Sequence, residues 1–190
     1  MKTLSTPYTV LDFWFGAPGS VQHGKPRVEW FKKSDAFDAQ IRDRFLPVYE
    51  QAQSGALDHW RSSPLTLLAQ IIVLDQFPRN MFRDTPRAFA TDARALDAAH
   101  RMTEQGWDLR LNAVERQFAY LPFEHAEDLE AQRTCMRLFK SLGNADLLEW
   151  ARKHYVIIER FGRFPHRNAI LGRASTPEEI EFLKQPGSGF

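Results

Sequence analysis

The sequence predicts an all-α protein of about eight helices, folded as a single domain over residues 1–190. Apolar residues recur at the 3.6-residue spacing of helices, and no segment alternates convincingly as a strand does. Capping and stop residues follow one another at intervals that suit helices of ordinary length. A chain of 190 residues buries a sufficient core without a metal or a disulfide. The single cysteine, Cys135, excludes an intramolecular disulfide framework.

Capping residues set the bounds of the first two helices. Thr6 before Pro7 predicts a helix start, and Gly16 predicts its end. Ser34 is the expected cap of a long second helix, and Gly55 is its expected end.

Prolines are expected to interrupt three helices. Pro47 lies inside the second helix and is predicted to kink or split it. An apolar third helix begins at residues 63–64 and runs through LTLLAQIIVL, which places it in the centre of the core; Pro78 is predicted to end it. Pro122 is predicted to end a short helix that begins after Asn112.

The remaining helices follow the same signals. Thr91 is the predicted cap of the helix over 92–105, and Thr176 is the predicted cap of a short last helix. Two longer helices are predicted between them, over 126–142 and 146–161. Residues 185–190 are expected to form a loose tail.

Charge and hydropathy narrow the classes of partner. The formal net charge is +1, so the molecule has no overall field that attracts nucleic acid or an anionic membrane. No targeting segment and no apolar run of about 20 residues is visible. We therefore expect a cytoplasmic protein that binds neither nucleic acid nor membrane.

Three polar clusters interrupt the apolar pattern, at residues 75–80, 124–128 and 160–168. Asp75 is an anion in what is predicted to be the last turn of a helix, where the helix dipole opposes it. It therefore needs a cation, and Arg79 is the nearest. Because charges beside apolar elements are costly unless they pair, we expect the three clusters to meet in one polar pocket. The predicted ligand-binding residues are Asp75, Arg79, Asn80, Glu124, His125, Asp128, Arg163, His166, Arg167 and Asn168.

The residue types in these clusters indicate an anionic ligand. Arginine side chains recognise phosphate or carboxylate with a planar fork of donors, and the clusters contain no lysine. His125, Asp128 and His166 are the candidates for acid–base catalysis. Whether the protein is an enzyme stays open, and no cofactor is indicated.

A metal site is a further alternative. Glu124, His125 and Asp128, joined by His154 or His166, carry the ligand types of zinc, iron or manganese. Their spacing matches no familiar ligand motif, so no metal is assigned.

The motifs that contain these clusters resemble a known family. VLDFWFG (10–16), LDQFPRN (74–80), LPFEHAED (121–128) and RFGRFPHRNAILGR (160–173) occur in the order seen in the bacterial family catalogued as domain of unknown function 924, and STPEE (175–179) fits the same pattern. The resemblance implies a tetratricopeptide-like architecture of stacked antiparallel helix pairs. It implies no reaction.

Two classes of function follow. Stacked helix pairs form concave surfaces that bind peptides, so the first expectation is a protein- or peptide-binding module with a polar groove of Arg, Asn, His and carboxylate side chains. The alternative is a pocket for a small anion, with or without catalysis by the His and carboxylate side chains. The oligomeric state is not predicted.

Overall fold

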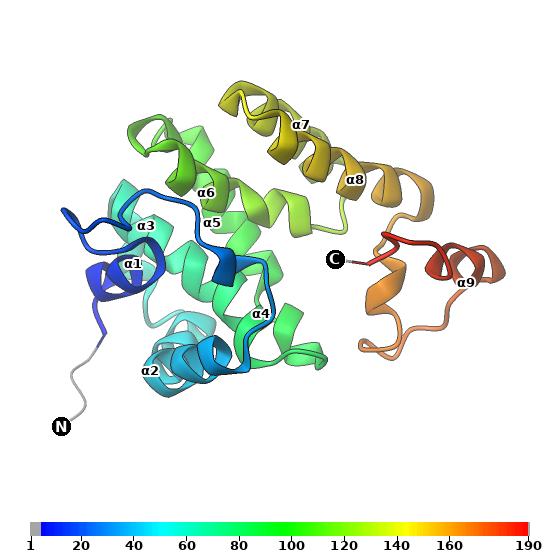
Figure 1. Cartoon of the computed structure of the whole chain (residues 1–190), viewed down its shortest axis with the longest axis horizontal. Coiled ribbons are helices and arrows are strands. Elements are labelled where there is room, and N and C mark those ends of the chain that lie inside the picture. Colours follow the sequence, from blue (N-terminus) through cyan, green and yellow to red (C-terminus); the bar gives the residue numbers. More distant parts are fainter. Residues whose placement is uncertain (1–4, 190) are drawn as a thin grey trace. The chain divides into compact units, whose positions relative to one another are not determined.

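A computed structural model describes residues 5–189 of the chain, and it confirms the all-α fold (Figure 1). Those residues form helices and turns, with no strand among them. The chain divides into two compact units. Unit 1 comprises the residues up to Arg83 together with Arg87–Pro122, and unit 2 comprises Asp84–Pro86 and the residues from Phe123 onward. The division into two units does not test the expectation of a single domain, which stays a prediction.

Unit 1 contains the helices of the N-terminal two thirds of the sequence. They are α1 (Pro7–Phe15), η1 (Val28–Trp30), α2 (Asp35–Ser54), η2 (Asp58–Ser62), α3 (Pro64–Ile71), η3 (Ile72–Gln76), α4 (Phe77–Met81), α5 (Asp92–Glu104), η5 (Asp108–Arg110) and the part of α6 (Ala113–His125) up to Pro122; η4 (Pro86–Phe89) straddles the boundary. The predicted caps Thr6 and Ser34 accept hydrogen bonds from Thr9 and Phe37. The first two helices therefore begin and end where the sequence predicts.

An aromatic cluster fills the core of unit 1. The Trp14 ring meets Phe118 edge to face at 5.5 Å between centroids, and Trp30 meets Phe118 at 4.7 Å. Phe45 packs on Phe77 at 4.8 Å. Trp14 also meets Phe77 at 5.7 Å, so these contacts tie α1, α2, α4 and α6 together. Residues 67–71 of α3 are all buried. The central position of the apolar helix is thus confirmed.

The predicted end of that helix at Pro78 is wrong. The chain continues without a break from α3 through η3, a π-helical turn, into α4 as far as Met81. The wider turn brings the N–H of Phe77 to the carbonyl of Ile72, five residues back. Proline removes the N–H that would bond the Leu74 carbonyl in an α-helix, and the Thr91 hydroxyl donates to that carbonyl instead, at 2.6 Å. Thr91 stands at the N-cap position of α5, as predicted, but its side chain makes no capping hydrogen bond.

The other two prolines also leave their helices intact. Pro47 lies on the exposed face of α2, where water can reach the carbonyl that its ring leaves unbonded, so the helix is not split. The helix α6 runs past Pro122 to His125. Its last turn is closed by Gln132, whose Nε2 donates to the carbonyls of Phe123 and Glu124 at 3.2 and 2.7 Å.

Unit 2 consists of the last turn of α6 and the C-terminal helices. These are α7 (Leu129–Leu142), α8 (Ala145–Phe161), η6 (Pro165–Arg167) and α9 (Pro177–Leu183). α7 and α8 pack against each other and are joined at Gly143, whose left-handed φ of 75° ends α7 (Figure 1). Ile157, Ile158 and Phe164 form one buried apolar cluster of this unit.

The C-terminal predictions hold in outline. Thr176 and Glu179 form the predicted capping box of α9, and α7 begins three residues later than expected because Asp128 is its cap. Residues 185–189 form turns, and Phe190 lies outside the described residues. With α3, η3 and α4 taken as one continuous helix, residues 5–189 contain eight α-helices. Stacking of helix pairs in a tetratricopeptide-like superhelix stays a prediction.

No helix within residues 5–189 combines the length and the apolar composition that a membrane crossing requires.

Candidate functional site

The first predicted cluster is an ion-pair network inside unit 1. Asp75 is fully buried, and the Arg79 guanidinium lies 3.3 Å from its carboxylate, so the predicted pair forms. Its position differs from the prediction, since Asp75 lies in the π-helical turn and not at a helix end. Arg79 also holds Asp92 with two parallel bonds of 2.8 and 2.9 Å. These carboxylates raise the pKa of Arg79 against the opposing effect of burial. The fork of Arg79 is therefore occupied by the protein's own anions.

The predicted residues of the last cluster are bound in the same way within unit 2. Arg163 binds Glu179 through Nε and Nη2 at 2.6 and 2.8 Å. Asn168 donates to Ser175 at 3.0 Å and to Glu179 at 3.3 Å. The bond from Arg163, together with the other donors, lowers the pKa of Glu179 to about 2. This network fixes the start of α9 against the turn that follows α8.

A second carboxylate–arginine pair, which we did not predict, fixes the same segment. Glu127 accepts from the Phe164 backbone N–H at 2.7 Å and from Arg173 Nη2 at 2.9 Å. Arg173 also donates to the Phe164 carbonyl at 3.2 Å. Bonding to Arg173 and Phe164 lowers the pKa of Glu127, although burial opposes the shift. Glu127 and Arg173 lie in the motifs at 121–128 and 160–173. Nothing in their spacing or charge marks them as partners among the other acids and arginines of the sequence.

Histidines surround Phe164 in unit 2. His154 is buried, with Nδ1 2.9 Å from the Trp150 carbonyl and 3.5 Å from Glu124 Oε1. Its ring lies 6.4 Å from that of His125 and 5.6 Å from that of Phe164. Desolvation lowers the pKa of His154 to about 3, the hydrogen bond to the Trp150 carbonyl opposes this shift, and the nearby Arg167 adds to it. Desolvation also lowers the pKa of His166 to about 4, so both imidazoles are neutral at pH 7.

The other predicted residues of unit 2 have structural contacts. Asp128 is the cap of α7 and accepts from the Ala131 N–H at 2.7 Å. Arg167 is buried, with its guanidinium 4.5 Å from the centre of the Phe164 ring. Across residues 5–189, no three His, Cys, Asp or Glu side chains are arranged to hold a metal ion. The metal alternative therefore gains no support. A catalytic role for His125, Asp128 and His166 stays a prediction.

Asn80 lines a cavity in unit 1. Its Nδ2 donates to Asp38 Oδ1 at 2.8 Å, and Arg83 binds the same carboxylate through Nε and Nη2 at 2.5 and 3.0 Å. Asp38 is 9 % exposed and Asn80 is 6 % exposed. Both residues line this cavity of about 280 Å³ between the start of α2 and the end of α4.

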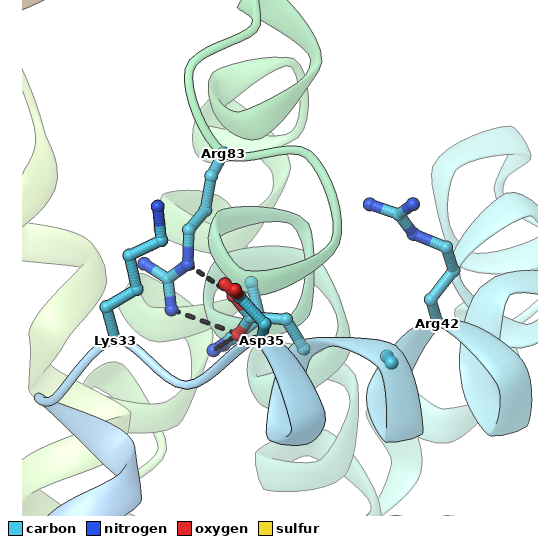
Figure 2. A pocket seen from close by; sticks show the side chains of 7 residues that line it. Lys33, Asp35, Arg42 and Arg83 are labelled. Atoms are coloured by element: carbon cyan, nitrogen blue, oxygen red, sulfur yellow. Dashed lines mark hydrogen bonds and ion pairs between the residues drawn. The ribbon is translucent and has the colours of Figure 1, made fainter.

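Three cationic side chains surround this cavity. Lys33 and Arg83 stand on one side of Asp35, and Arg42 stands on the other (Figure 2). Arg42 also donates through Nη2 to the carbonyl of Met81, the last residue of α4. Two of the lining residues are anions, Asp35 and Asp38, against three cations. The cavity is therefore positive, and we call it the α2 cavity.

The residues that line the α2 cavity are hard to identify from the sequence alone. Asp38 is adjacent to the apolar stripe that contains Phe37 and Ile41, so its burial was readable from the helical spacing. A buried carboxylate in that position requires donors, but nothing in the sequence identifies Asn80 and Arg83, 42 and 45 residues away. In the sequence, Lys33 looks like an ordinary surface residue of the loop before α2, and Arg42 looks like an ordinary surface residue of the helix.

Comparisons with known proteins agree with the resemblance in the sequence. The family model described as "Bacterial protein of unknown function (DUF924)" matches residues 10–187. A solved structure titled "Structure of Protein of Unknown Function ATU0120 from Agrobacterium tumefaciens" is 40 % identical, with a TM-score of 0.85, and the match covers 94 % of this chain and 96 % of that one. No curated protein matches the chain.

Proposed function

Given that the chain belongs to the bacterial DUF924 family, we propose that it binds a small molecule through a phosphate or carboxylate group in the α2 cavity. Of the residues predicted for an anion pocket, the proposal retains Asn80, which lines the cavity. Arg79 and Arg163 hold carboxylates of the protein, so they are assigned to its architecture.

The excess of cationic donors at the α2 cavity carries this proposal. Asp38 already accepts from Arg83 and Asn80, and Asp35 lies in the first turn of α2, where the helix dipole stabilises a carboxylate. Lys33 has no hydrogen bond or ion pair among the described residues, and Arg42 bonds a neutral carbonyl. The lining therefore keeps a net charge of +1, and neither Lys33 nor Arg42 is paired with a carboxylate of residues 5–189. Arginine supplies a planar fork and lysine a point charge, a combination that suits phosphate and carboxylate.

Thermal denaturation with a panel of anions tests the proposal. A ligand that binds with a Kd of about 1 mM stabilises the folded state by about 1.4 kcal/mol at 10 mM. For a chain of this size we expect the midpoint to rise by about 3–6 °C with phosphate or a carboxylate. Chloride at the same ionic strength is the control and should give no such rise. Divalent metal chlorides complete the panel.

Substitutions separate this cavity from general charge effects. Lys33→Gln and Arg42→Gln should each remove most of the stabilisation by phosphate. Lys32→Gln is the matched control, because Lys32 is the exposed neighbour of Lys33 and does not line the cavity. If all three variants respond to phosphate as the parent protein does, the α2 cavity is not the anion site.

A peptide carboxylate is the second candidate, and one observation favours it. Phe31 is 66 % exposed and lies two residues before Lys33, so we assign to it the apolar contact with a chain end bound in the cavity. This version keeps the expectation of a peptide-binding module with a tetratricopeptide-like architecture. A tripeptide with an apolar last residue should bind with its free carboxylate and lose at least tenfold in affinity when amidated. Phe31→Ser should weaken the tripeptide and leave phosphate unaffected.

A further inference from the structure

A second cavity in unit 1 has a different chemistry. It measures about 280 Å³ and is lined by residues of η2, α3 and α5 and by Leu74 of η3. We call it the α5 cavity. Its charged residues are two arginines and two aspartates, so it carries no net charge. Small-molecule pockets usually measure about 300–1,000 Å³, so the occupant of this one is small.

Two ion pairs form the rim of the α5 cavity. Arg94 Nη2 lies 2.7 Å from Asp58 Oδ1, and Arg61 is paired with Asp97. The aspartate side chains are 50 % and 68 % exposed, so their remaining lone pairs are open to solvent. A neutral ligand that offers both signs of charge can therefore meet a guanidinium and a carboxylate at once.

Three unsatisfied polar side-chain atoms belong to residues that line this cavity. Gln70 is 1 % exposed; its Nε2 donates to the Leu57 carbonyl at 3.2 Å and to Asp58 at 3.3 Å, while its Oε1 accepts no hydrogen bond. The Nε atoms of Arg61 and Arg94 are also buried and have no acceptor. A buried polar atom without a partner destabilises the fold. Two donors and one acceptor around one cavity therefore call for a ligand with an acceptor and a donor.

We infer that the α5 cavity binds a free α-amino acid. The ligand's carboxylate faces the guanidiniums of Arg61 and Arg94, and its ammonium group faces the Gln70 amide oxygen and the Asp58 carboxylate. Leu74 and Ala93 give the cavity an apolar wall, which favours an aliphatic side chain. The zwitterion has no net charge, as the cavity has none, and this distinguishes the α5 cavity from the positive α2 cavity.

Titration of the full chain with L-leucine tests the inference. We expect saturable binding by calorimetry, with amide shifts in the NMR spectrum at Gln70 and Arg94. N-acetyl-L-leucine lacks the ammonium charge and L-leucinamide lacks the carboxylate, so each should bind at least tenfold more weakly. Equal binding of either analogue overturns the assignment to an amino acid, and absence of any response to 10 mM L-leucine means that the cavity holds water only.

Variants tie the binding to the α5 cavity. Arg94→Gln should weaken L-leucine at least tenfold, and Gln70→Leu should do the same by removing the buried acceptor. Because Gln70 is buried, folding of that variant is checked first by circular dichroism, and Arg61→Gln replaces it if it does not fold. Arg87→Gln is the control, since Arg87 pairs with Glu50 elsewhere on the surface. Unchanged binding in Arg94→Gln and Arg61→Gln would overturn the inference. Lys33→Gln should leave L-leucine binding intact, which separates this result from any failure at the α2 cavity.

Discussion

Asp75 is a charged residue that is completely buried, so its charge is costly to the fold unless it is paired. Its carboxylate is fully buried beside Arg79, which also holds Asp92. Removal of one partner from a buried pair costs about 3–5 kcal/mol. Because Arg79 keeps Asp92, we expect Asp75→Ala to lower the free energy of unfolding by about 3 kcal/mol, near the lower end of that range. In thermal denaturation this corresponds to a fall of about 6–12 °C.

The control for this substitution is Asp97→Ala. Asp97 forms an ion pair with Arg61, but its side chain is 68 % exposed, and exposed pairs contribute about 0–1 kcal/mol. A stability of Asp75→Ala equal to that of Asp97→Ala would refute the structural role of the buried pair.

His154 and His166 make stability depend on pH. Their pKa values in the folded protein are about 3 and about 4, against an ordinary value of 6.5, and desolvation is the main cause. The unfolded chain therefore binds more protons than the folded one below pH 6.5. The free energy of unfolding is highest above pH 6.5 and falls as the pH drops toward 4, by up to about 1.4 kcal/mol per pH unit for each histidine. Acid charges imidazoles that lie beside His125 and Arg167, which adds repulsion.

Urea denaturation between pH 7 and pH 4.5 measures this dependence. His154→Gln should make the fall in stability about half as steep, because one of the two groups no longer titrates. His59→Gln replaces an exposed imidazole and serves as the control. An unchanged slope in His154→Gln would show that other groups cause the acid sensitivity.

At the residue scale, the sequence predicted pairs whose partners are close along the chain. Asp75 and Arg79 are four residues apart, and helical spacing alone brings them together. The arginine partners of Asp38 and Glu127 come from 45 and 46 residues away, and only the packing of helices determines which arginine reaches which carboxylate. The cations of the α2 cavity were missed for the same reason.

At the scale of elements, the π-helical turn η3 joins α3 to α4 without a break in the helix. Thr91 supports that turn by donating to the Leu74 carbonyl. Thr91→Val keeps the shape of the side chain and removes the donor, so we expect the free energy of unfolding to fall by about 1–2 kcal/mol. Chemical denaturation measures the difference.

A threonine on the same helix provides the comparison for Thr91. Thr103 bonds carbonyls of α5 itself, at the helix surface, so Thr103→Val should cost less than about 0.5 kcal/mol. If the two variants are equally stable, the hydroxyl of Thr91 is not what sustains the turn.

Helix starts were predictable and the ends set by proline were not. Thr6, Ser34, Asn112 and Thr176 act through hydrogen bonds within three residues, so the local sequence contains the whole signal. A proline costs about 3 kcal/mol inside a helix, and distant residues offset that cost. Thr91 bonds the Leu74 carbonyl that Pro78 leaves without a donor, and Gln132 bonds the Glu124 carbonyl at the end of the helix that contains Pro122. Neither residue is a neighbour of the proline in the sequence.

At the scale of the whole molecule, the balance of charges predicts how the protein responds to polyanions. The net charge is +1, and the densest basic segment pairs with acids of α9, Arg160 with Glu178 and Arg163 with Glu179. We expect no tight binding of a DNA or RNA probe at 150 mM salt, measured by fluorescence anisotropy. Sub-micromolar binding that weakens steeply with added salt would contradict this expectation.

The α2 cavity is what the proposed function rests on, and calorimetric titration with inorganic phosphate tests it most directly. The parent protein and Lys32→Gln should bind one phosphate with the same affinity, and added sodium chloride should weaken both. Lys33→Gln and Arg42→Gln should each lose at least tenfold in affinity, about 1.4 kcal/mol, without loss of folding. No heat of binding in the parent protein, or equal affinity in all four proteins, would contradict an anion site at the start of α2.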